Sequence, residues 1–168
     1  MASKFLSLVS GRIREIAATA ISLGVADDGK IVALGTDGRL DSSVMPVGIG
    51  AETKSIVASE TLNAGNLVNI WNSAGIFKVR KADATTAGKE ANGFVLGSVS
   101  NGGTATVYLE GTITGFSALL PGRYYLGISP GEATETPPSG SGNVVQYIGN
   151  AVSGTEISFE PTEGVILA

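Results

Sequence analysis

The chain has 168 residues, of which 43% are hydrophobic and 15% are charged, and its formal net charge is −4. This length suits one domain of ordinary size plus an arm, and the acidic balance argues against a nucleic-acid partner, which would require a basic patch. The sequence contains no cysteine and no histidine, which excludes disulfides, thiolate metal sites and histidine-based catalysis.

The low charged fraction predicts that part of the surface is buried in an oligomer or against a larger assembly. The alternative is a small β-protein whose surface is built from Ser, Thr, Asn and Gly. The first residues do not resemble a signal peptide, because their apolar run is short and interrupted by serine. No stretch approaches the roughly 20 apolar residues that cross a membrane. We therefore expect cytosolic synthesis and no membrane partner.

The first predicted element is a β-hairpin. Phe5–Val9 and Arg12–Ile16 are short runs suited to strands, and they flank the two-residue turn Ser10-Gly11. A helix is the alternative, since apolar residues also recur at helical spacing, at Val9, Ile13, Ile16, Ala17 and Ala20. Gly11 would weaken the interior of that helix, which favours the hairpin. Either element is too small to fold alone and must dock on another surface.

A connector with two polar turns follows, over Ala26–Pro46. Asp-Gly pairs favour turns with positive φ, so tight reversals are predicted at Asp27–Gly29 and Thr36–Gly38. Pro46, Gly48 and Gly50 close the segment. We therefore predict an N-terminal attachment arm and connector over residues 1–50 and a β-domain over residues 51–168.

The β-domain is predicted to consist of short strands rich in Val, Ile, Thr, Tyr and Phe, punctuated by turn residues. The predicted strands are Thr53–Ser59, Leu67–Asn72, Ile76–Ala82, Gly93–Val99, Thr104–Glu110, Arg123–Ile128, Val144–Val152 and Glu156–Glu160. Turns at Asn72–Gly75 and Asn101–Gly103 should join antiparallel strands. Alternation over Thr104–Glu110 predicts one wet face and one buried face. The regular spacing indicates an all-β sandwich or barrel.

The longest predicted loop runs from Gly131 to Gly142. Its prolines lack the backbone donor that a sheet requires and its glycines weaken strands, so the loop is expected to protrude. It is interpreted either as a contact or receptor loop or as a solvated crossover between sheets. Arg12, Arg14, Lys78, Arg80 and Lys81 are expected on the solvent faces of strands.

Two groups of residues carry a family pattern. The first group comprises Gly29–Ile31, Leu34, Asp37–Asp41, Ser43 and Pro46. It resembles the connector of tailed-bacteriophage fibre and head-decoration proteins. Glu60–Ile70 resembles the opening of phage structural β-modules, and later segments continue that pattern in order, at Lys78–Ala84, Ala91–Leu96, Pro121–Leu126, Pro130–Gly131, Gly142–Val152 and Ile157–Pro161.

The resemblance implies an attachment region joined to an outward-facing β-domain, usually within a homotrimer. It offers no catalytic residue to carry over, and we expect no cofactor and no metal site. The sequence contains one connector and one β-module, without the shaft repeats of long tail fibres, and this favours head decoration.

The remaining chemical motifs are interpreted as structural. Gly127–Gly131 matches the serine-hydrolase elbow around Ser129, but no histidine exists to take the serine proton, and Pro130 lacks the donor needed for an oxyanion hole. The strand is therefore expected to end in a Pro-Gly turn. Calcium ligation is the alternative reading of four turn-forming aspartates, Asp27, Asp28, Asp37 and Asp41, but their spacing does not fit a calcium-binding loop.

Two further sets of side chains leave alternatives open. The carboxylates show no recognisable acid/base pair, so a polysaccharide-degrading enzyme is disfavoured; they are Glu110, Glu132, Glu135, Glu156, Glu160 and Glu163. Four aromatic residues are expected in core or interface packing, with sugar stacking as the alternative; they are Trp71, Tyr124, Tyr125 and Tyr147.

We therefore expect a non-enzymatic virion structural protein. It would act as a cement protein on the capsid exterior, bound to the major capsid protein as a homotrimer and made in the host cytoplasm. Its N-terminal element, roughly Ala2–Ile21, would dock on the major capsid protein or wrap a sister subunit. The alternative is a receptor-binding tail-fibre or adhesin module, in which the 131–142 loop and exposed aromatic residues contact a host surface glycan.

Overall fold

The computed structural model describes residues 4–36, 38–45 and 50–168. The chain divides into two compact units, Met1–Gly50 and Ala51–Ala168. Asp37 and Pro46 of the expected connector, Gly48 after it and Ala2 of the expected attachment element lie outside the described residues. Each unit is described by itself.

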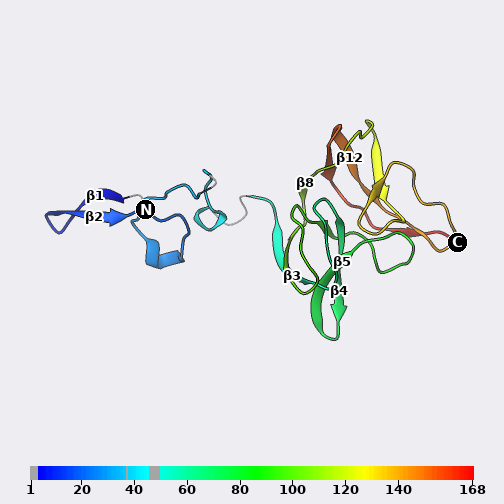
Figure 1. The fold of residues 1–168 in the computed structure, drawn as a ribbon, viewed down its shortest axis with the longest axis horizontal. Coiled ribbons are helices and arrows are strands. Elements are labelled where there is room, and N and C mark those ends of the chain that lie inside the picture. Colours follow the sequence, from blue (N-terminus) through cyan, green and yellow to red (C-terminus); the bar gives the residue numbers. More distant parts are fainter. Residues whose placement is uncertain (1–3, 37, 46–49) are drawn as a thin grey trace. The chain divides into compact units, whose positions relative to one another are not determined.

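The N-terminal unit contains a two-stranded hairpin, so the hairpin prediction is confirmed and the helix alternative is wrong. Strand β1 (Lys4–Val9) pairs antiparallel with β2 (Arg12–Ala17), in a register that places Leu8 opposite Ile13 (Figure 1). The turn residues Ser10 and Gly11 both have positive φ, as a two-residue hairpin turn of the mirror-image type requires.

The rest of the N-terminal unit, including the connector, contains two 3₁₀ turns and one bridge. The turns are η1 (Gly24–Asp27) and η2 (Ser42–Val44). Thr19 and Val32 form an isolated parallel bridge, in which the Thr19 amide donates to the Ile31 carbonyl over 3.0 Å. No described helix has the length and apolar composition needed to cross a membrane.

A closed barrel forms the first half of the C-terminal unit. Its strands, in order around the barrel, are β3 (Thr53–Ala58), β5 (Ile76–Lys81), β4 (Leu67–Ser73), β6 (Gly93–Phe94) and β7 (Thr104–Tyr108). Strands β3 and β5 pair in parallel, and the other pairs are antiparallel. In β7, Ala105 and Val107 are buried while Thr104 and Thr106 are exposed, which confirms the predicted alternation.

A five-stranded sheet forms the second half of this unit. Its order is β10 (Ala133–Thr134), β9 (Arg123–Leu126), β12 (Tyr147–Ser153), β13 (Glu156–Phe159) and β8 (Gly111–Thr114). A separate antiparallel pair joins β11 (Val144–Val145) to β14 (Val165–Ile166). The all-β prediction is thus confirmed, with the barrel realised and a second sheet beside it.

Two buried clusters hold the C-terminal unit together. One fills the barrel and comprises Ala58, Leu62, Val68, Val79, Val95, Ala105 and Val107. The other combines residues of the barrel strands with residues of the five-stranded sheet, and comprises Leu67, Ala82, Ala84, Ala91, Phe94, Ile113, Leu126, Ile148 and Phe159. Phe94 contacts both Tyr108 and Phe159, with ring centroids 5.4 Å and 5.3 Å away. This second cluster joins the barrel to the sheet.

Several predicted strand boundaries were wrong. The strand predicted over Gly93–Val99 ends at Phe94, so the turn at Asn101–Gly103 does not close a regular hairpin. The strand predicted over Val144–Val152 is split at Gln146 into β11 and β12. Strands β8, β10 and β14 were not predicted. The Asn72–Gly75 turn is confirmed, with the Gly75 amide donating to Asn72 Oδ1 over 2.6 Å.

Candidate functional site

The N-terminal unit has no buried hydrophobic residue in the part of it that the structure describes. The register of the hairpin places Leu6, Leu8 and Ile13 on one side of the two strands, and these side chains are 73%, 71% and 73% exposed. We call these three residues the hairpin face. An exposed apolar surface of this kind on a two-stranded hairpin is typical of a contact surface.

The rest of the N-terminal unit exposes a second series of large apolar side chains: Ile21, Leu23 and Val25 before the connector, and Ile31, Val32, Leu34, Leu40 and Met45 within it. Its backbone is held by local polar contacts instead of a core. The Ser22 amide donates to Ser43 Oγ over 2.8 Å, and Asp41 caps η2 by accepting from the Ser43 amide over 2.9 Å. The backbone of this segment is fixed by hydrogen bonds, but its apolar side chains can be buried only against another surface.

Asp27 and Asp41 act as turn residues. Asp27 accepts hydrogen bonds from the Leu23 amide and from Lys30 Nζ, and these bonds lower the pKa of its carboxyl group. The hydrogen bonds from Ser43 likewise lower the pKa of Asp41. No cluster of three acidic residues that could hold a metal occurs in the described part of the chain. The calcium alternative therefore gains no support from the described aspartates, and Asp37 lies outside the described residues.

Ser129 lies in a tight turn between β9 and β10. The Glu132 amide donates to the Ser129 carbonyl over 3.2 Å, and Gly131 has a φ of 83°. This is the expected Pro-Gly turn. Gly131 also ties the turn to the barrel, because its amide donates to the Ala82 carbonyl and its carbonyl accepts from the Leu67 amide.

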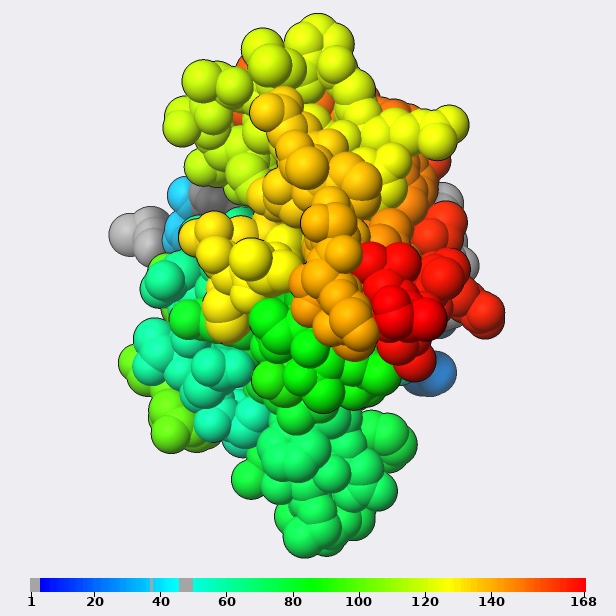
Figure 2. Space-filling view, turned by 90° about the vertical axis from the view of Figure 1, so that its right-hand side faces the viewer, coloured from blue at the N-terminus to red at the C-terminus, as the bar shows by residue number. Residues whose placement is uncertain are grey.

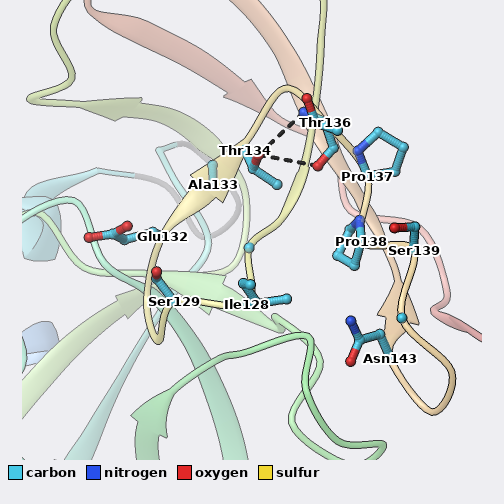
Figure 3. A pocket seen from close by; sticks show the side chains of 12 residues that line it. Ile128, Ser129, Glu132, Ala133, Thr134, Thr136, Pro137, Pro138, Ser139 and Asn143 are labelled. Atoms are coloured by element: carbon cyan, nitrogen blue, oxygen red, sulfur yellow. Dashed lines mark hydrogen bonds between the residues drawn. The ribbon is translucent and has the colours of Figure 1, made fainter.

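A cavity of about 490 Å³ opens beside this turn (Figure 3). Hydroxyl groups, prolines and one carboxylate line it, from Gly127, Ile128, Ser129, Glu132, Ala133, Thr134, Thr136, Pro137, Pro138, Ser139, Gly140 and Asn143. Glu132 is the one acidic residue among these lining residues, so the cavity does not present a carboxylate pair. Of the other predicted carboxylates, Glu156 accepts a hydrogen bond from Ser153 Oγ and Glu160 accepts one from Ser158 Oγ.

The 131–142 loop is more regular than predicted. Ala133 and Thr134 form β10, in register with Leu126 and Tyr125 of β9. Figure 2 shows the following segment (orange) lying along the surface of the unit, next to the final residues (red). The Gly142 amide donates to the Leu167 carbonyl over 2.9 Å, which fixes the end of the loop. The loop therefore lies along the surface of the unit, and the prediction that it protrudes was wrong.

The predicted aromatic residues have different environments. Tyr124 is buried, and its hydroxyl group contacts both the amide and the carbonyl of Leu120. Trp71 is half-buried and donates from Nε1 to Ser59 Oγ over 3.2 Å. The Arg80 guanidinium lies 4.8 Å from the Trp71 ring centroid, and Arg80 Nε donates to Asn69 Oδ1. The prediction that Arg80 only decorates a solvent face was therefore wrong. These residues serve packing.

Tyr125 and Tyr147 lie on neighbouring strands and face a shared pocket. They are opposite each other in the register of β9 and β12, with ring centroids 6.2 Å apart and planes at 75°. The pocket has a volume of about 360 Å³ and is completed by Arg123, Asn150 and Thr162. We call these five residues the tyrosine pocket. The sequence had singled out the tyrosines but not the polar residues around them.

Two buried polar residues that the sequence analysis did not select organise the unit. Burial raises the pKa of the Asp83 carboxyl, but hydrogen bonds from Thr85 and Lys89 outweigh it and leave that pKa below its ordinary value. Gln146 donates from Nε2 to the carbonyls of Ala91 and Thr162 over 3.0 Å and 2.9 Å. In the sequence, Asp83 follows an apolar residue at the end of a predicted strand, and Gln146 interrupts an apolar run. These positions were the only sequence signal that the two polar side chains would be buried.

The chain matches no family model, and no curated protein matches it. Among solved structures, it is similar to the head fiber gp8.5 N base of bacteriophage phi29, with a TM-score of 0.44 and 14% sequence identity. That likeness covers 66% of this chain and 95% of the other. At this TM-score and identity, it establishes neither a shared fold nor a shared function.

Proposed function

We propose that this protein is a virion structural protein that decorates and stabilises the exterior of a phage capsid. In this proposal it binds the major capsid protein as a homotrimer. The observation that carries the proposal is the N-terminal unit, which exposes large apolar side chains and buries none among its described residues. The connector pattern from Gly29 to Pro46 supplies the family context.

The division of labour between the two units supports this role. The clusters of the C-terminal unit are built entirely from residues after Ala51, so that unit has the core it needs to fold alone. The N-terminal unit has none and gains stability by burying the hairpin face and the connector residues. Each large apolar side chain that becomes fully buried contributes about 1.5–3 kcal/mol. Many repeated subunits would then add contact area between capsomers.

Imaging of an intact particle tests the location of the protein. Many copies on the head, each with the N-terminal unit against the shell, are the expected result. A few copies on the tail would contradict decoration and favour the receptor-binding alternative.

Truncation tests the attachment surface. Deletion of residues 1–24 should abolish binding to capsids that lack the protein, while the C-terminal unit keeps its circular dichroism spectrum and melting transition. Binding that survives this deletion would place the attachment surface elsewhere. Sedimentation of the full chain tests the oligomer separately: the mass of three chains is expected, and a monomer at micromolar concentration contradicts the trimer.

A further inference from the structure

We infer that the tyrosine pocket is a saccharide-binding site, formed by Arg123, Tyr125, Tyr147, Asn150 and Thr162. The inference rests on the pocket alone and holds whether or not the chain attaches to a capsid.

The floor of the pocket is aromatic. Tyr125 and Tyr147 are half-buried, so each ring packs against the sheet and keeps part of its surface open to solvent. The faces of such rings stack favourably on the C–H groups of a pyranose, and the amphipathic tyrosine keeps its hydroxyl group at the wet edge. The volume of about 360 Å³ is enough for one or two sugar rings.

The polar rim can make hydrogen bonds to a ligand. In the described part of the chain, no side-chain hydrogen bond or ion pair engages the polar ends of Arg123, Tyr125, Tyr147 or Asn150. Arg123 and Asn150 are paired in register across β9 and β12, so their backbones hold them at a fixed spacing. An arginine and an amide next to an aromatic floor offer several donors and one acceptor to the hydroxyl groups of a sugar.

The wall of the pocket is held in place before any ligand binds. The Thr162 amide donates to the Tyr147 carbonyl over 3.0 Å, and the Thr162 carbonyl accepts from Gln146 Nε2 over 2.9 Å. Thr162 is thereby fixed over the strand that carries Tyr147. A preformed wall reduces the ordering cost of binding.

Arg123 is the one charged residue among those that line the pocket, so a sugar carboxylate would find a cation there, while Glu135 lines the adjoining cavity that shares Arg123 and Tyr125. Neutral sugars and uronate-containing sugars can both stack on the tyrosine rings, but only the uronate carboxylate can form an ion pair with Arg123. Arg123→Gln should therefore weaken binding of a uronate-containing chain more than binding of a neutral chain.

The test uses the full chain on an array of bacterial surface polysaccharides, both neutral and uronate-containing, followed by calorimetric titration of the strongest binder. Tyr147→Ala should lower its affinity about tenfold or more, and Asn150→Ala, at an exposed position, should lower it about threefold or more. Phe77→Ala, which removes an aromatic ring that is 75% exposed on another hairpin, is the matched control and should leave affinity unchanged.

Three outcomes would overturn the inference. One is an array without any bound saccharide, and another is an equal loss of affinity in the Phe77→Ala control. The third is a Tyr147→Ala variant that keeps its fold but changes the oligomeric state without changing glycan binding, because the pocket would then be a contact between subunits. A folded Asn150→Ala variant keeps the test decisive even if Tyr147→Ala does not fold.

Discussion

Gln146 and Ala91 form two hydrogen bonds with each other, although 55 positions separate them in the sequence. Gln146 Oε1 accepts from the Ala91 amide over 2.7 Å, and Gln146 Nε2 donates to the Ala91 carbonyl over 3.0 Å. Between the end of β11 and the start of β12, the Gln146 side chain thus makes the two hydrogen bonds to Ala91 that a neighbouring strand would otherwise make. It satisfies backbone groups that would otherwise be buried without partners.

Replacement of Gln146 by alanine should therefore destabilise the C-terminal unit. The change removes three hydrogen bonds and leaves the buried Ala91 amide without a partner, so a loss of about 3 kcal/mol in the free energy of unfolding is expected. Urea unfolding followed by circular dichroism measures it. Asn63→Ala, which shortens an exposed amide side chain, is the control and should change the free energy by less than about 0.5 kcal/mol.

The Asp83 carboxylate should make stability depend on pH in the acid range. Its pKa is lowered in the folded protein, so its contribution is present above the ordinary aspartate value of about 3.9 and is lost as the pH falls through the folded value. Asp83→Asn should cost about 1–3 kcal/mol at pH 7, and the gap from the wild type should close in more acidic solution. Denaturant titrations from pH 7 to strongly acidic buffer provide the comparison.

Glu110→Gln is the matched control for this experiment, because Glu110 is exposed in the same unit. It should leave the free energy of unfolding at pH 7 unchanged. A gap for Asp83→Asn that stays constant throughout the acid range would contradict a role for the charge.

At Gly149 the backbone of β13 leaves no room for a side chain on β12. A Cβ atom at this position would lie 1.8 Å from the Ser158 carbonyl oxygen, and backbone cannot move aside as a flexible side chain can. Gly149→Ala should cost about 4 kcal/mol or more, or prevent folding. Gly154→Ala lies in the turn of the same hairpin, where a Cβ meets nothing within 4 Å, and should be close to neutral. Thermal unfolding of the two variants distinguishes them, and equal stability would contradict the clash.

The hairpin face should control attachment. Leu8→Asp introduces a charge into an apolar contact and should weaken binding to capsids that lack the protein at least about tenfold. Ser7→Asp introduces the same charge one residue earlier on the opposite side of β1, and should weaken binding much less. Co-sedimentation with capsids gives both affinities. Equal losses for the two variants would show that charge alone, not the hairpin face, matters.

The strands with strong local patterns were predictable from sequence. Strands β4, β5 and β7 combine β-branched or aromatic residues with clear turn signals, and their positions were confirmed. Strands of two residues, such as β10, carry too little local pattern to detect, and β8 is bounded by Gly111 and Gly115, which suggest a turn. These segments are strands because neighbouring strands pair with them, and their own residues show no clear strand preference.

The tyrosine pocket could be predicted only in part. Aromatic residues in strand patterns were visible, but Tyr124 points into the core while its neighbour Tyr125 faces the pocket, and sequence alternation alone does not say which. The pairing of Tyr125 with Tyr147 depends on the register between β9 and β12, which includes an irregularity between Tyr147 and Gly149. Long-range register of this kind is set by tertiary packing.

The closed barrel affects how readily copies of the C-terminal unit could pair strand to strand with one another. Every one of its five strands has a neighbour on each side, so none is a full-length edge strand, although the pairings through β6 and between β3 and β5 cover only one or two residues each. The separate sheet ends in β10 and β8, and both of these edge strands are short. Short or absent edges suppress sheet-to-sheet aggregation between identical chains. This arrangement limits strand-to-strand pairing between copies of the unit held at high local concentration.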